Sequence, residues 1–187
     1  MKRFVMKDTP LAGLKLIKRE CLKDERGFFS RLFCAEELAS IFNIEKHIVQ
    51  INHTHTYQAG SIRGLHFQLP PHSEIKIVSC LVGKIFDVVV DLRKNSATFL
   101  QWHAEILSAD NNHSLLIPEG FAHGFQTLTD DCHLIYCHSA FYAPHAEAGL
   151  HYQDSKLGIA WPCETTCISK RDQLHPFLLE TFKGLLI

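Results

Sequence analysis

Short blocks of apolar residues alternate with polar and turn-forming residues along most of this chain. Segments that are rich in β-branched and aromatic side chains predict β-strands. The segments that fit are residues 14–18, 28–33, 47–56, 75–82, 84–92, 102–107, 114–117, 121–128 and 133–142. Glycine, proline, asparagine and aspartate residues separate them, which is typical of turns between strands. Many short strands at this spacing predict an all-β sandwich or barrel.

The predicted strand at residues 84–92 differs from the others because it contains three consecutive valines. Val88, Val89 and Val90 leave no polar position between them, so both faces of this strand are expected to be covered. Asp87 and Asp91 are separated by an even number of residues and therefore share one face. We predict a central strand of a closed structure, with one face that is not plain hydrophobic core.

Two segments predict helices, and nothing divides the chain into separate domains. Residues 35–42 place Leu38, Ile41 and Phe42 on one face of a helix, and a second short helix is predicted near residues 173–183. The sequence has no internal repeat, low-complexity segment or linker. A chain of 187 residues is long enough for one domain with a substantial core. We therefore predict a single domain over residues 1–187.

Charge and cysteine content argue against several classes of partner. The formal net charge is −1 without a basic stripe or acidic tail, so we expect neither nucleic acid nor an anionic membrane as a partner. A few local arginines could still bind a phosphate-bearing substrate. The seven cysteines are irregularly spaced, and no apolar run has the length of a signal peptide or a membrane span. These features predict a cytoplasmic protein with reduced thiols.

Two runs carry the candidate chemistry. The first is Arg63-Gly64-Leu65-His66-Phe67-Gln68, and the second is Pro118-Glu119-Gly120-Phe121-Ala122-His123. Each places a histidine on or beside a predicted strand, next to glycine and aromatic residues, which is typical of a lined pocket. Two pocket-facing histidines on an all-β barrel indicate either metal binding or proton transfer.

Metal binding is the weaker of these two interpretations. The Pro-x-Gly-x-x-His pattern that ends at His123 resembles the second motif of cupin barrels, whose histidine often binds a metal. The first cupin motif normally supplies a His-x-His pair, but Gln68 stands at the second position here, and Glu74 is a weak substitute. Three protein ligands are the usual minimum for a catalytic metal. His53 and His55 form a His-x-His pair without a third ligand in view, and thirteen histidines produce such pairs by chance.

Three further residues have an ordinary structural interpretation beside a functional one. Lys76 opens an apolar strand, either as a solvent-facing edge residue or as a cation directed into the pocket. Tyr136 lies in a predicted strand, where a tyrosine usually packs with its hydroxyl group tethered. Asp172 precedes the second predicted helix and could be its N-cap. From the residues alone these alternatives stay open.

Taken together, seven segments resemble the dTDP-4-dehydrorhamnose 3,5-epimerase family, whose members act on nucleotide-linked 4-keto-6-deoxy sugars. The segments lie at residues 24–29, 49–53, 63–68, 83–88, 107–109, 117–125 and 158–162. They occur in the family's order and extend over nearly the whole chain. The resemblance implies a cupin-type double-stranded β-helix, or jelly roll, with a few short helices. It also implies that the enzyme uses no metal and no cofactor.

The resemblance assigns roles to individual residues. His66 would be the general base, and Asp172 would be the carboxylate that orients it. Tyr136 would deliver a proton to the opposite face of the sugar, and Lys76 would stabilise an enolate oxygen. The matching substrate-binding positions are Arg26, Phe29, Gln50, Asn52, Arg63, His123, Tyr142, Glu147 and Arg171. The partners would be a nucleotide-sugar substrate and a second subunit, because family members form homodimers in which the amino-terminal strand of one subunit helps to build the other's site.

The chemistry of such a reaction suits these residue types. A ketone at carbon 4 acidifies the C–H groups at carbons 3 and 5, so removal of either proton gives an enolate. A histidine base near neutral pH typically contributes about 10²–10⁴ in rate. A fixed cation at the enolate oxygen stabilises the charge that develops there. Inversion then requires an acid on the other face of the sugar.

The chain departs from the family pattern at several positions. Glu74-Ile75 stands where Gln-Gly usually precedes the lysine, and Ser79 stands in place of a common arginine. Arg31 replaces a glutamate, and Cys137 replaces a lysine. These departures leave open the nucleotide, the sugar and the number of inverted centres. The alternative functions are a mono-epimerase on a related nucleotide sugar, a metal-dependent cupin and a non-catalytic sugar-nucleotide binder.

Overall fold

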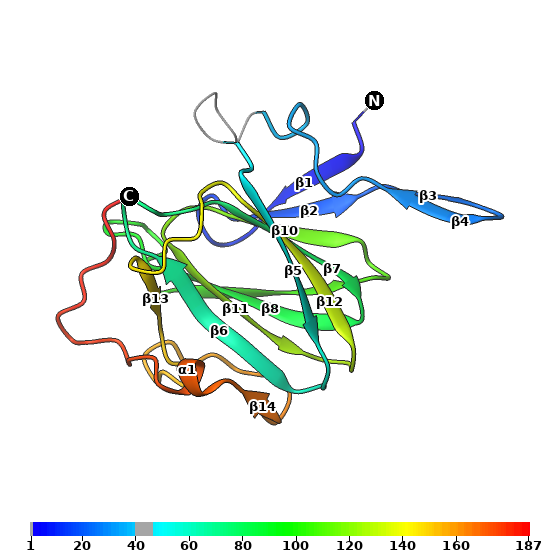
Figure 1. Ribbon diagram of the computed structural model, residues 1–187. Helices are drawn as coiled ribbons and strands as arrows, with labels where there is room; N and C mark the ends of the chain where they lie inside the picture. The colour runs from blue at the N-terminus through cyan, green and yellow to red at the C-terminus, as the bar shows by residue number, and fades with distance from the viewer. Residues whose placement is uncertain (1, 40–46) are drawn as a thin grey trace.

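The computed structural model describes residues 2–39 and 47–187 and consists almost entirely of β-strands. One six-stranded sheet has the order β1 (Phe4–Asp8), β2 (Lys15–Arg19), β10 (His113–Ile117), β7 (Lys76–Val82), β12 (Cys132–His138) and β5 (Gln50–Thr56). The second has the order β13 (Glu147–Gly149), β6 (Ser61–Gln68), β11 (Phe121–Thr127), β8 (Lys84–Asp91) and β9 (Trp102–Ser108), and β14 (Cys167–Ile168) pairs with β6. The two sheets lie over each other as the layers of a sandwich (Figure 1). The predicted jelly roll is confirmed.

Two small elements lie outside these layers. The hairpin of β3 (Cys21–Asp24) and β4 (Gly27–Ser30) projects away from the sandwich (Figure 1). The helix α1 (Lys170–Gln173) follows β14 directly and lies against β6. No helix in the described part of the chain has the length and apolar character that crossing a membrane would require.

Each predicted strand segment overlaps a strand of the structure, although the ends differ. Strand β5 begins at Gln50 rather than at residue 47, and β12 ends at His138 rather than at residue 142. Five strands lie outside the predicted segments, namely β1, β3, β6, β13 and β14. In β1, Phe4 is the only buried residue and the other four are exposed. An edge strand of this kind lacks the apolar alternation on which the prediction depends.

The valine-rich strand β8 is covered on both faces, as predicted. Val89 is fully buried in the core between the sheets, in a cluster that includes Phe125. Val88 and Val90 are equally buried but belong to a second cluster, which includes Leu157 and other residues of the C-terminal third. The C-terminal third of the chain therefore covers the outer face of the second sheet.

The helix predicted at residues 35–42 is wrong where the structure describes it. Residues 35–39 form turns, and residues 40–42 lie outside the described residues. Glu37 accepts backbone hydrogen bonds from Arg3 and Phe4 at 2.5 and 3.0 Å, and Leu38 is fully buried in the cluster that contains Phe4. The segment is thus tied to the first sheet at both residues, and this tertiary docking overrides the local helical pattern.

The helix predicted at residues 173–183 is also wrong. The helix α1 ends at Gln173, and residues 175–179 have no regular structure. Pro176 has no backbone N–H, and its ring disfavours the helical conformation for His175 before it. Ser169 is the N-cap of α1, because its side chain accepts a hydrogen bond from the backbone N–H of Asp172. Asp172 is therefore in the first turn of the helix and is not its cap.

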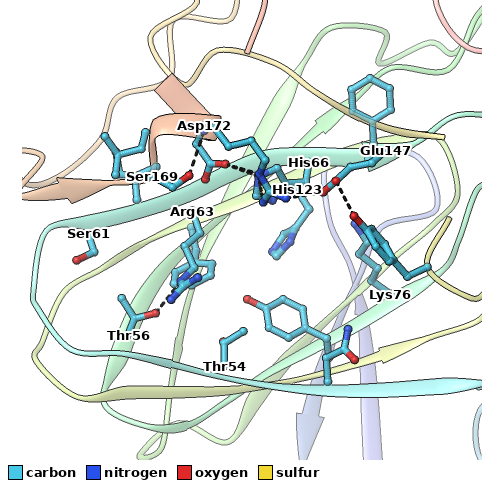
Figure 2. A pocket seen from close by; sticks show the side chains of 18 of the residues that line it. Thr54, Thr56, Ser61, Arg63, His66, Lys76, His123, Glu147, Ser169 and Asp172 are labelled. Carbon is cyan, nitrogen blue, oxygen red and sulfur yellow. Dashed lines mark hydrogen bonds and ion pairs between the residues drawn. The ribbon is translucent and has the colours of Figure 1, made fainter. Parts of the chain in front are cut away.

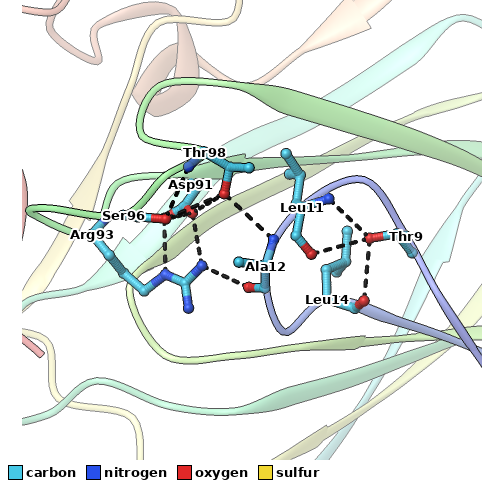
Figure 3. A network of polar contacts seen from close by, with 8 residues as sticks. All are labelled: Thr9, Leu11, Ala12, Leu14, Asp91, Arg93, Ser96 and Thr98. Atoms are coloured by element: carbon cyan, nitrogen blue, oxygen red, sulfur yellow. Dashed lines mark hydrogen bonds and ion pairs between the residues drawn. The ribbon is translucent and has the colours of Figure 1, made fainter.

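A network around Asp91 closes the loop that follows β8 (Figure 3). Arg93 donates to both carboxylate oxygens through Nε at 2.9 Å and Nη2 at 2.7 Å. Ser96 and Thr98 each donate a hydroxyl hydrogen bond to Oδ2 at 2.6 Å. Arg93 Nη2 also donates to the carbonyl oxygen of Ala12 at 2.6 Å. The network thus joins the β8–β9 connection to the loop between β1 and β2.

Candidate active site

A pocket of about 700 Å³ lies between the two sheets, a volume typical of small-molecule sites. Strands β5, β7 and β12 form one wall, and β6 and β11 form the other. The pocket brings together eleven of the thirteen predicted site positions, which are Gln50, Asn52, Arg63, His66, Lys76, His123, Tyr136, Tyr142, Glu147, Arg171 and Asp172. Arg26 and Phe29 are not among its lining residues.

His66 on β6 forms a dyad with Asp172 in the first turn of α1 (Figure 2). His66 Nε2 lies 2.9 Å from Asp172 Oδ1. Because an ionised carboxylate only accepts hydrogen bonds, Nε2 carries the proton and Nδ1 is the basic nitrogen of the neutral ring. In the described part of the chain, no hydrogen-bond partner is found for Nδ1. The dyad therefore offers Nδ1 as a base, and Asp172 can stabilise the imidazolium that forms when Nδ1 takes a proton.

Gly64 fixes the carboxylate of Asp172 from the β6 side. Its backbone N–H donates to Asp172 Oδ2 at 3.1 Å. Gly64 has a φ of +128°, and a Cβ atom at this position would come within 2.6 Å of the Cα atom of Gly124 on β11. Only glycine allows this close approach of two strands together with this backbone conformation. The glycine beside His66 in the sequence therefore has a direct structural reason.

The pKa of Asp172 reflects these contacts. The residue is only 2% exposed, and burial by itself would raise the pKa of its carboxyl group. The hydrogen bond and charge of His66, with the backbone N–H of Gly64, instead hold the pKa of Asp172 well below its ordinary range. Asp172 thus stays ionised at neutral pH and can support a protonated His66 without taking the proton itself.

Tyr136 faces the dyad from the other wall of the pocket. It lies on β12, in the first sheet, whereas His66 lies on β6, in the second. Burial, and then the negative charge of Asp87, raise the pKa of Tyr136 far above its ordinary value. The phenol is therefore protonated at neutral pH. An acid and a base consequently lie on opposite walls of one pocket.

His123 forms a second histidine–carboxylate pair in the pocket. It lies on β11, directly opposite His66 in the strand register, and its Nε2 lies 2.9 Å from Asp87 Oδ2. Burial raises the pKa of Asp87, although the charge of His123 and its hydrogen bond oppose the rise. The even spacing of Asp87 and Asp91 on β8 therefore marks two polar sites on an otherwise apolar face, as the sequence predicted.

A third pair, which sequence reasoning did not select, joins His138 to Glu74. His138 Nδ1 lies 2.8 Å from Glu74 Oε2, and Lys76 Nζ lies 3.2 Å from Glu74 Oε1. All three residues line the pocket. His138 follows Tyr136 by two residues on β12 and so shares its face. That period-two spacing was the available signal for His138, but thirteen histidines obscured it.

Polar residues at the sides of the pocket hold one another in place. Arg171 Nη1 donates to Glu147 Oε1 at 2.9 Å, and the Tyr142 hydroxyl donates to Glu147 Oε2 at 2.8 Å. Arg63 Nε donates to Thr56 Oγ1 at 3.0 Å (Figure 2). Arg63 is exposed, and the Arg171 side chain is 56% exposed. Two guanidinium groups are thus available to an anionic ligand, as phosphate recognition requires.

Arg26 and Phe29 lie on the projecting β3–β4 hairpin. Phe29 is 59% exposed, and the neighbouring Phe28 is 68% exposed. Arg26 forms an ion pair with Asp24 at 2.5 Å within the same hairpin. A single chain therefore does not bring these two predicted positions into its own pocket.

The His-x-His pair at His53 and His55, which the sequence indicated as a chance occurrence, lies outside the pocket. Both residues point away from it, because Asn52, Thr54 and Thr56 occupy the pocket-facing positions of β5. His53 Nε2 lies 2.9 Å from His133 Nδ1, and His55 Nε2 lies 3.0 Å from Asp131 Oδ1. The pair belongs to a surface cluster of polar residues.

Among the described residues, the ligand atoms of His66, Asp172 and His175 are the only three His, Cys, Asp or Glu groups that converge closely enough to hold a metal. However, Arg171 Nε lies 3.3 Å from Asp172 Oδ1, and Arg171 Nη2 lies 3.3 Å from His66 Nε2. A guanidinium cation thus already occupies the space beside the atoms that a metal would need. This arrangement fits a metal ion poorly.

The chain matches known proteins over most of its length. The family described as dTDP-4-dehydrorhamnose 3,5-epimerase matches residues 8–180. The chain belongs to this family. A relative named dTDP-4-dehydrorhamnose 3,5-epimerase from Shigella flexneri is 38% identical over 164 residues, which cover 88% of this chain and 90% of that protein.

Solved structures of epimerases have the same fold. A dTDP-6-deoxy-D-glucose-3,5-epimerase from Legionella pneumophila Philadelphia 1, in complex with dTDP-4-keto-L-rhamnose, superposes with a TM-score of 0.91 at 36% identity and covers 98% of each chain. A 3'-monoepimerase from Streptomyces bikiniensis, in complex with dTDP-quinovose, has a TM-score of 0.83 at 31% identity. That match covers 90% of this chain and 85% of the other. Solved structures that share this fold therefore include epimerases whose names differ in the number of centres inverted.

Proposed function

We propose that this protein inverts carbons 3 and 5 of a nucleotide-linked 4-keto-6-deoxy sugar, of the type dTDP-4-dehydro-6-deoxyglucose to dTDP-4-dehydrorhamnose. The observation that carries the proposal is the placement of the His66–Asp172 dyad and of Tyr136 on opposite walls of one pocket. Inversion of a C–H centre needs a base on one face of the sugar ring and an acid on the other. Family membership supports the same substrate class.

The reaction proceeds through an enolate. His66 Nδ1 removes the proton from carbon 5 or carbon 3, and the electron pair moves onto the oxygen at carbon 4. The Lys76 ammonium stabilises that oxygen, and Asp172 stabilises the imidazolium of His66. Tyr136 then delivers a proton to the opposite face of the same carbon. Solvent takes the proton from His66 and restores the proton of Tyr136 before the next inversion. No step requires a metal or another cofactor.

The remaining pocket residues bind and orient the substrate. Arg63 and Arg171 provide cations for the diphosphate, with Glu147 holding Arg171 in place. Gln50, Asn52 and Tyr142 supply hydrogen-bonding groups and an aromatic wall beside the sugar. His123 lines the sugar pocket from β11, where Asp87 fixes its ring.

We propose that the active protein is a homodimer with exchanged amino-terminal segments. The exposed phenylalanines of the β3–β4 hairpin and the position of Arg26 outside its own pocket support this proposal. The hairpin of one subunit would place Arg26 and Phe29 at the pocket of the other. Mixing the inactive variants His66→Ala and Arg26→Ala tests this directly. Shared sites restore activity in mixed dimers, whereas self-contained sites give no recovery.

We also propose a cytoplasmic setting, since all seven cysteines are free thiols. Cys80, Cys132 and Cys137 are buried, and burial raises the pKa of Cys80 to about 12. Such thiols act as small packing residues. Fractionation of cells that produce the protein tests the location, and recovery in a membrane or secreted fraction contradicts it.

The experiment that tests the function is incubation with dTDP-4-dehydro-6-deoxyglucose in heavy water, followed by proton NMR. We expect deuterium to enter at both carbons 3 and 5. The His66→Ala variant should show no exchange. The Tyr136→Phe variant should keep its fold but invert either neither carbon or only one of the two. Unchanged double inversion by both variants would contradict the residue assignments. No exchange by the unmodified protein would move the search to other nucleotide sugars or to a binding role.

One alternative has a specific observation in its favour. The fold is also close to that of a 3'-monoepimerase, so inversion of a single centre is the second candidate. Deuterium at carbon 3 alone would identify it in the same experiment. Elemental analysis together with activity after chelation separates both from a metal-dependent cupin, for which chelation abolishes turnover.

A further inference from the structure

Two titratable residues of the pocket, Glu74 and His138, have no part in the mechanism proposed above. They belong to a line of polar side chains that crosses three neighbouring strands, from Lys76 on β7 through Glu74 and His138 to Asn52 on β5. Lys76 Nζ donates to Glu74 Oε1 at 3.2 Å, and His138 Nδ1 donates to Glu74 Oε2 at 2.8 Å. The side chains of these three residues are 9–11% exposed. A single buried carboxylate is therefore shared between a lysine and a histidine.

Glu74 is ionised in spite of its burial. Burial by itself would raise the pKa of Glu74, but the hydrogen bond from His138 and the charges of Lys76 and His138 bring it below its ordinary value. A buried anion in contact with Lys76 offsets the positive charge that an enolate oxygen would otherwise meet. A glutamine at this position would leave the lysine charge intact, because an amide carries no charge. The glutamate of this chain therefore needs a compensating cation.

We propose that His138 is this cation: as an imidazolium it balances Glu74, so that Lys76 still presents a net positive charge to the enolate oxygen. The inference rests on the proposed function, in which Lys76 faces that oxygen. Lys76 and His138 each contribute one positive charge and Glu74 contributes one negative charge, which leaves a net charge of about +1. His138 touches Glu74 and acts through it, so it is a positioning and charge-balancing residue.

The other groups around His138 are compatible with a charged ring. The neutral phenol of Tyr136 stacks beside it, with 6.1 Å between the ring centroids. The Asn52 amide lies 3.3 Å from His138 Nε2. A half-turn of that amide presents its oxygen to a protonated nitrogen, at the cost of the 3.2 Å hydrogen bond that Asn52 Oδ1 accepts from Gln50 Nε2. On the other sheet, the carboxylate of Asp87 is bound by His123. In the described part of the pocket, Glu74 is thus the carboxylate in direct contact with His138.

The charge of His138 can be measured without any substrate. Nitrogen-15 NMR of the histidine rings distinguishes an imidazolium from a neutral ring, and loss of a signal in His138→Asn assigns the resonance. We expect an imidazolium at pH 7 in the unmodified protein and a neutral ring in Glu74→Gln. A neutral His138 at pH 7 in the unmodified protein would overturn the inference.

Kinetics test the consequence for catalysis. In His138→Asn, Glu74 is left to neutralise Lys76, so we expect kcat to fall about 30-fold with little change in KM. This fall in kcat is smaller than the factor of about 10²–10³ that loss of an oxyanion donor costs. Glu74→Gln should lower kcat only about threefold, because Lys76 keeps its charge but loses an anchor. The double variant Glu74→Gln/His138→Asn should recover to about the level of Glu74→Gln alone. A double variant no better than His138→Asn would refute charge balance, since a structural defect is not repaired by a second deletion.

A matched control uses a histidine–carboxylate pair on the outer face of the first sheet. Asp131→Asn removes the carboxylate that pairs with His55 at 3.0 Å, and kcat should stay unchanged. A failure of the proposed function is recognised separately. In that case the unmodified protein shows no deuterium exchange, while the NMR experiment still decides whether His138 balances Glu74.

Discussion

Two aspartates, Asp91 and Asp172, are alike in burial and in the direction of their pKa shift, but they differ in the chemistry that their hydrogen-bond partners allow. Each is almost fully buried, at 0% and 2% exposure, and each has a carboxyl pKa below the ordinary value. Asp91 is held by Arg93, Ser96 and Thr98, which lie within seven residues of it in the sequence. The two shorter hydrogen bonds to the carboxylate of Asp172 come from Gly64 and His66 on β6, more than 100 residues away, and Arg171 beside it contributes a longer one at 3.3 Å.

The difference lies in the partner and in access to the pocket. Arg93 keeps its charge at every accessible pH, so its bidentate pair with Asp91 is inert and stabilises a loop. His66 is an imidazole, a group that can act as a base, and its dyad with Asp172 opens onto a 700 Å³ pocket. A buried carboxylate becomes catalytic when its partner can change charge and can reach a substrate.

The largest expected effect is on activity, from Asp172→Asn. Asparagine still accepts a hydrogen bond from His66 but does not stabilise the imidazolium. We expect the rate of deuterium incorporation to fall by about 10²–10⁴. Chemical denaturation provides the control, because the fold should persist. If Asp172→Asn kept its rate of deuterium incorporation but lost stability, Asp172 would have the structural role that we assign to Asp91.

The matched substitution at the other site, Asp91→Asn, should act on stability instead. It removes the ion pair with Arg93 and leaves a partly buried guanidinium unpaired, which costs on the order of 3 kcal/mol of unfolding free energy. For a chain of this length that corresponds to a fall in Tm of about 6–12 °C. Scanning calorimetry measures the shift, and kcat should remain within about twofold of the unmodified value. A large loss of activity at full stability would show that this loop belongs to the site.

The pH dependence of stability should reveal Asp91 as well. Its contacts lower the pKa of Asp91 to about 2, despite the opposing effect of burial, whereas an unfolded aspartate has a pKa of about 3.9. Because the folded pKa is the lower one, this contribution is complete above about pH 4 and is lost as the pH falls towards 2. It amounts to about 2.5 kcal/mol. Urea denaturation at decreasing pH should show the gap between the unmodified protein and Asp91→Asn closing over this range, and a constant gap would contradict the assignment.

The smallest effect is expected from Thr98→Val. This change removes one hydroxyl donor to Asp91 Oδ2 but keeps the shape of the side chain. Loss of one hydrogen bond to a charged group should lower the unfolding free energy by about 1.5–3 kcal/mol, towards the low end because Arg93 and Ser96 remain. Denaturant midpoints measure it. A loss as large as that of Asp91→Asn would mean that Thr98, and not Arg93, supports the loop.

Local patterns predicted much of the fold. Each of the nine predicted segments overlaps a strand, and the three valines of β8 correctly indicated a strand covered on both sides. However, β6, which carries His66, was not among the predicted segments. The helix at residues 35–42 was wrong because Glu37 and Leu38 dock onto the first sheet, and such docking is not visible in a local window. The helix at residues 173–183 was wrong for a reason that the sequence did contain, namely Pro176.

The residues of the candidate site also fall into those that a local pattern revealed and those that it did not. His66 and His123 were found from their glycine-rich and aromatic neighbours, whereas Tyr136, Lys76 and Asp172 were selected only through the family resemblance. Glu74 and His138 were passed over, because a histidine on a strand has no distinguishing pattern until its carboxylate partner is known.

The sequence by itself determined most strands of the two sheets, their faces and the family, because these depend on residue order and on contacts between close neighbours. Only the tertiary structure decided which histidine meets which carboxylate. His66 and Asp172 are 106 residues apart, and His138 and Glu74 are 64 residues apart. Their pairing depends on how the two sheets close over the pocket, and burial there strengthens each pair by excluding water. The protonation states on which the chemistry depends are therefore set by the fold.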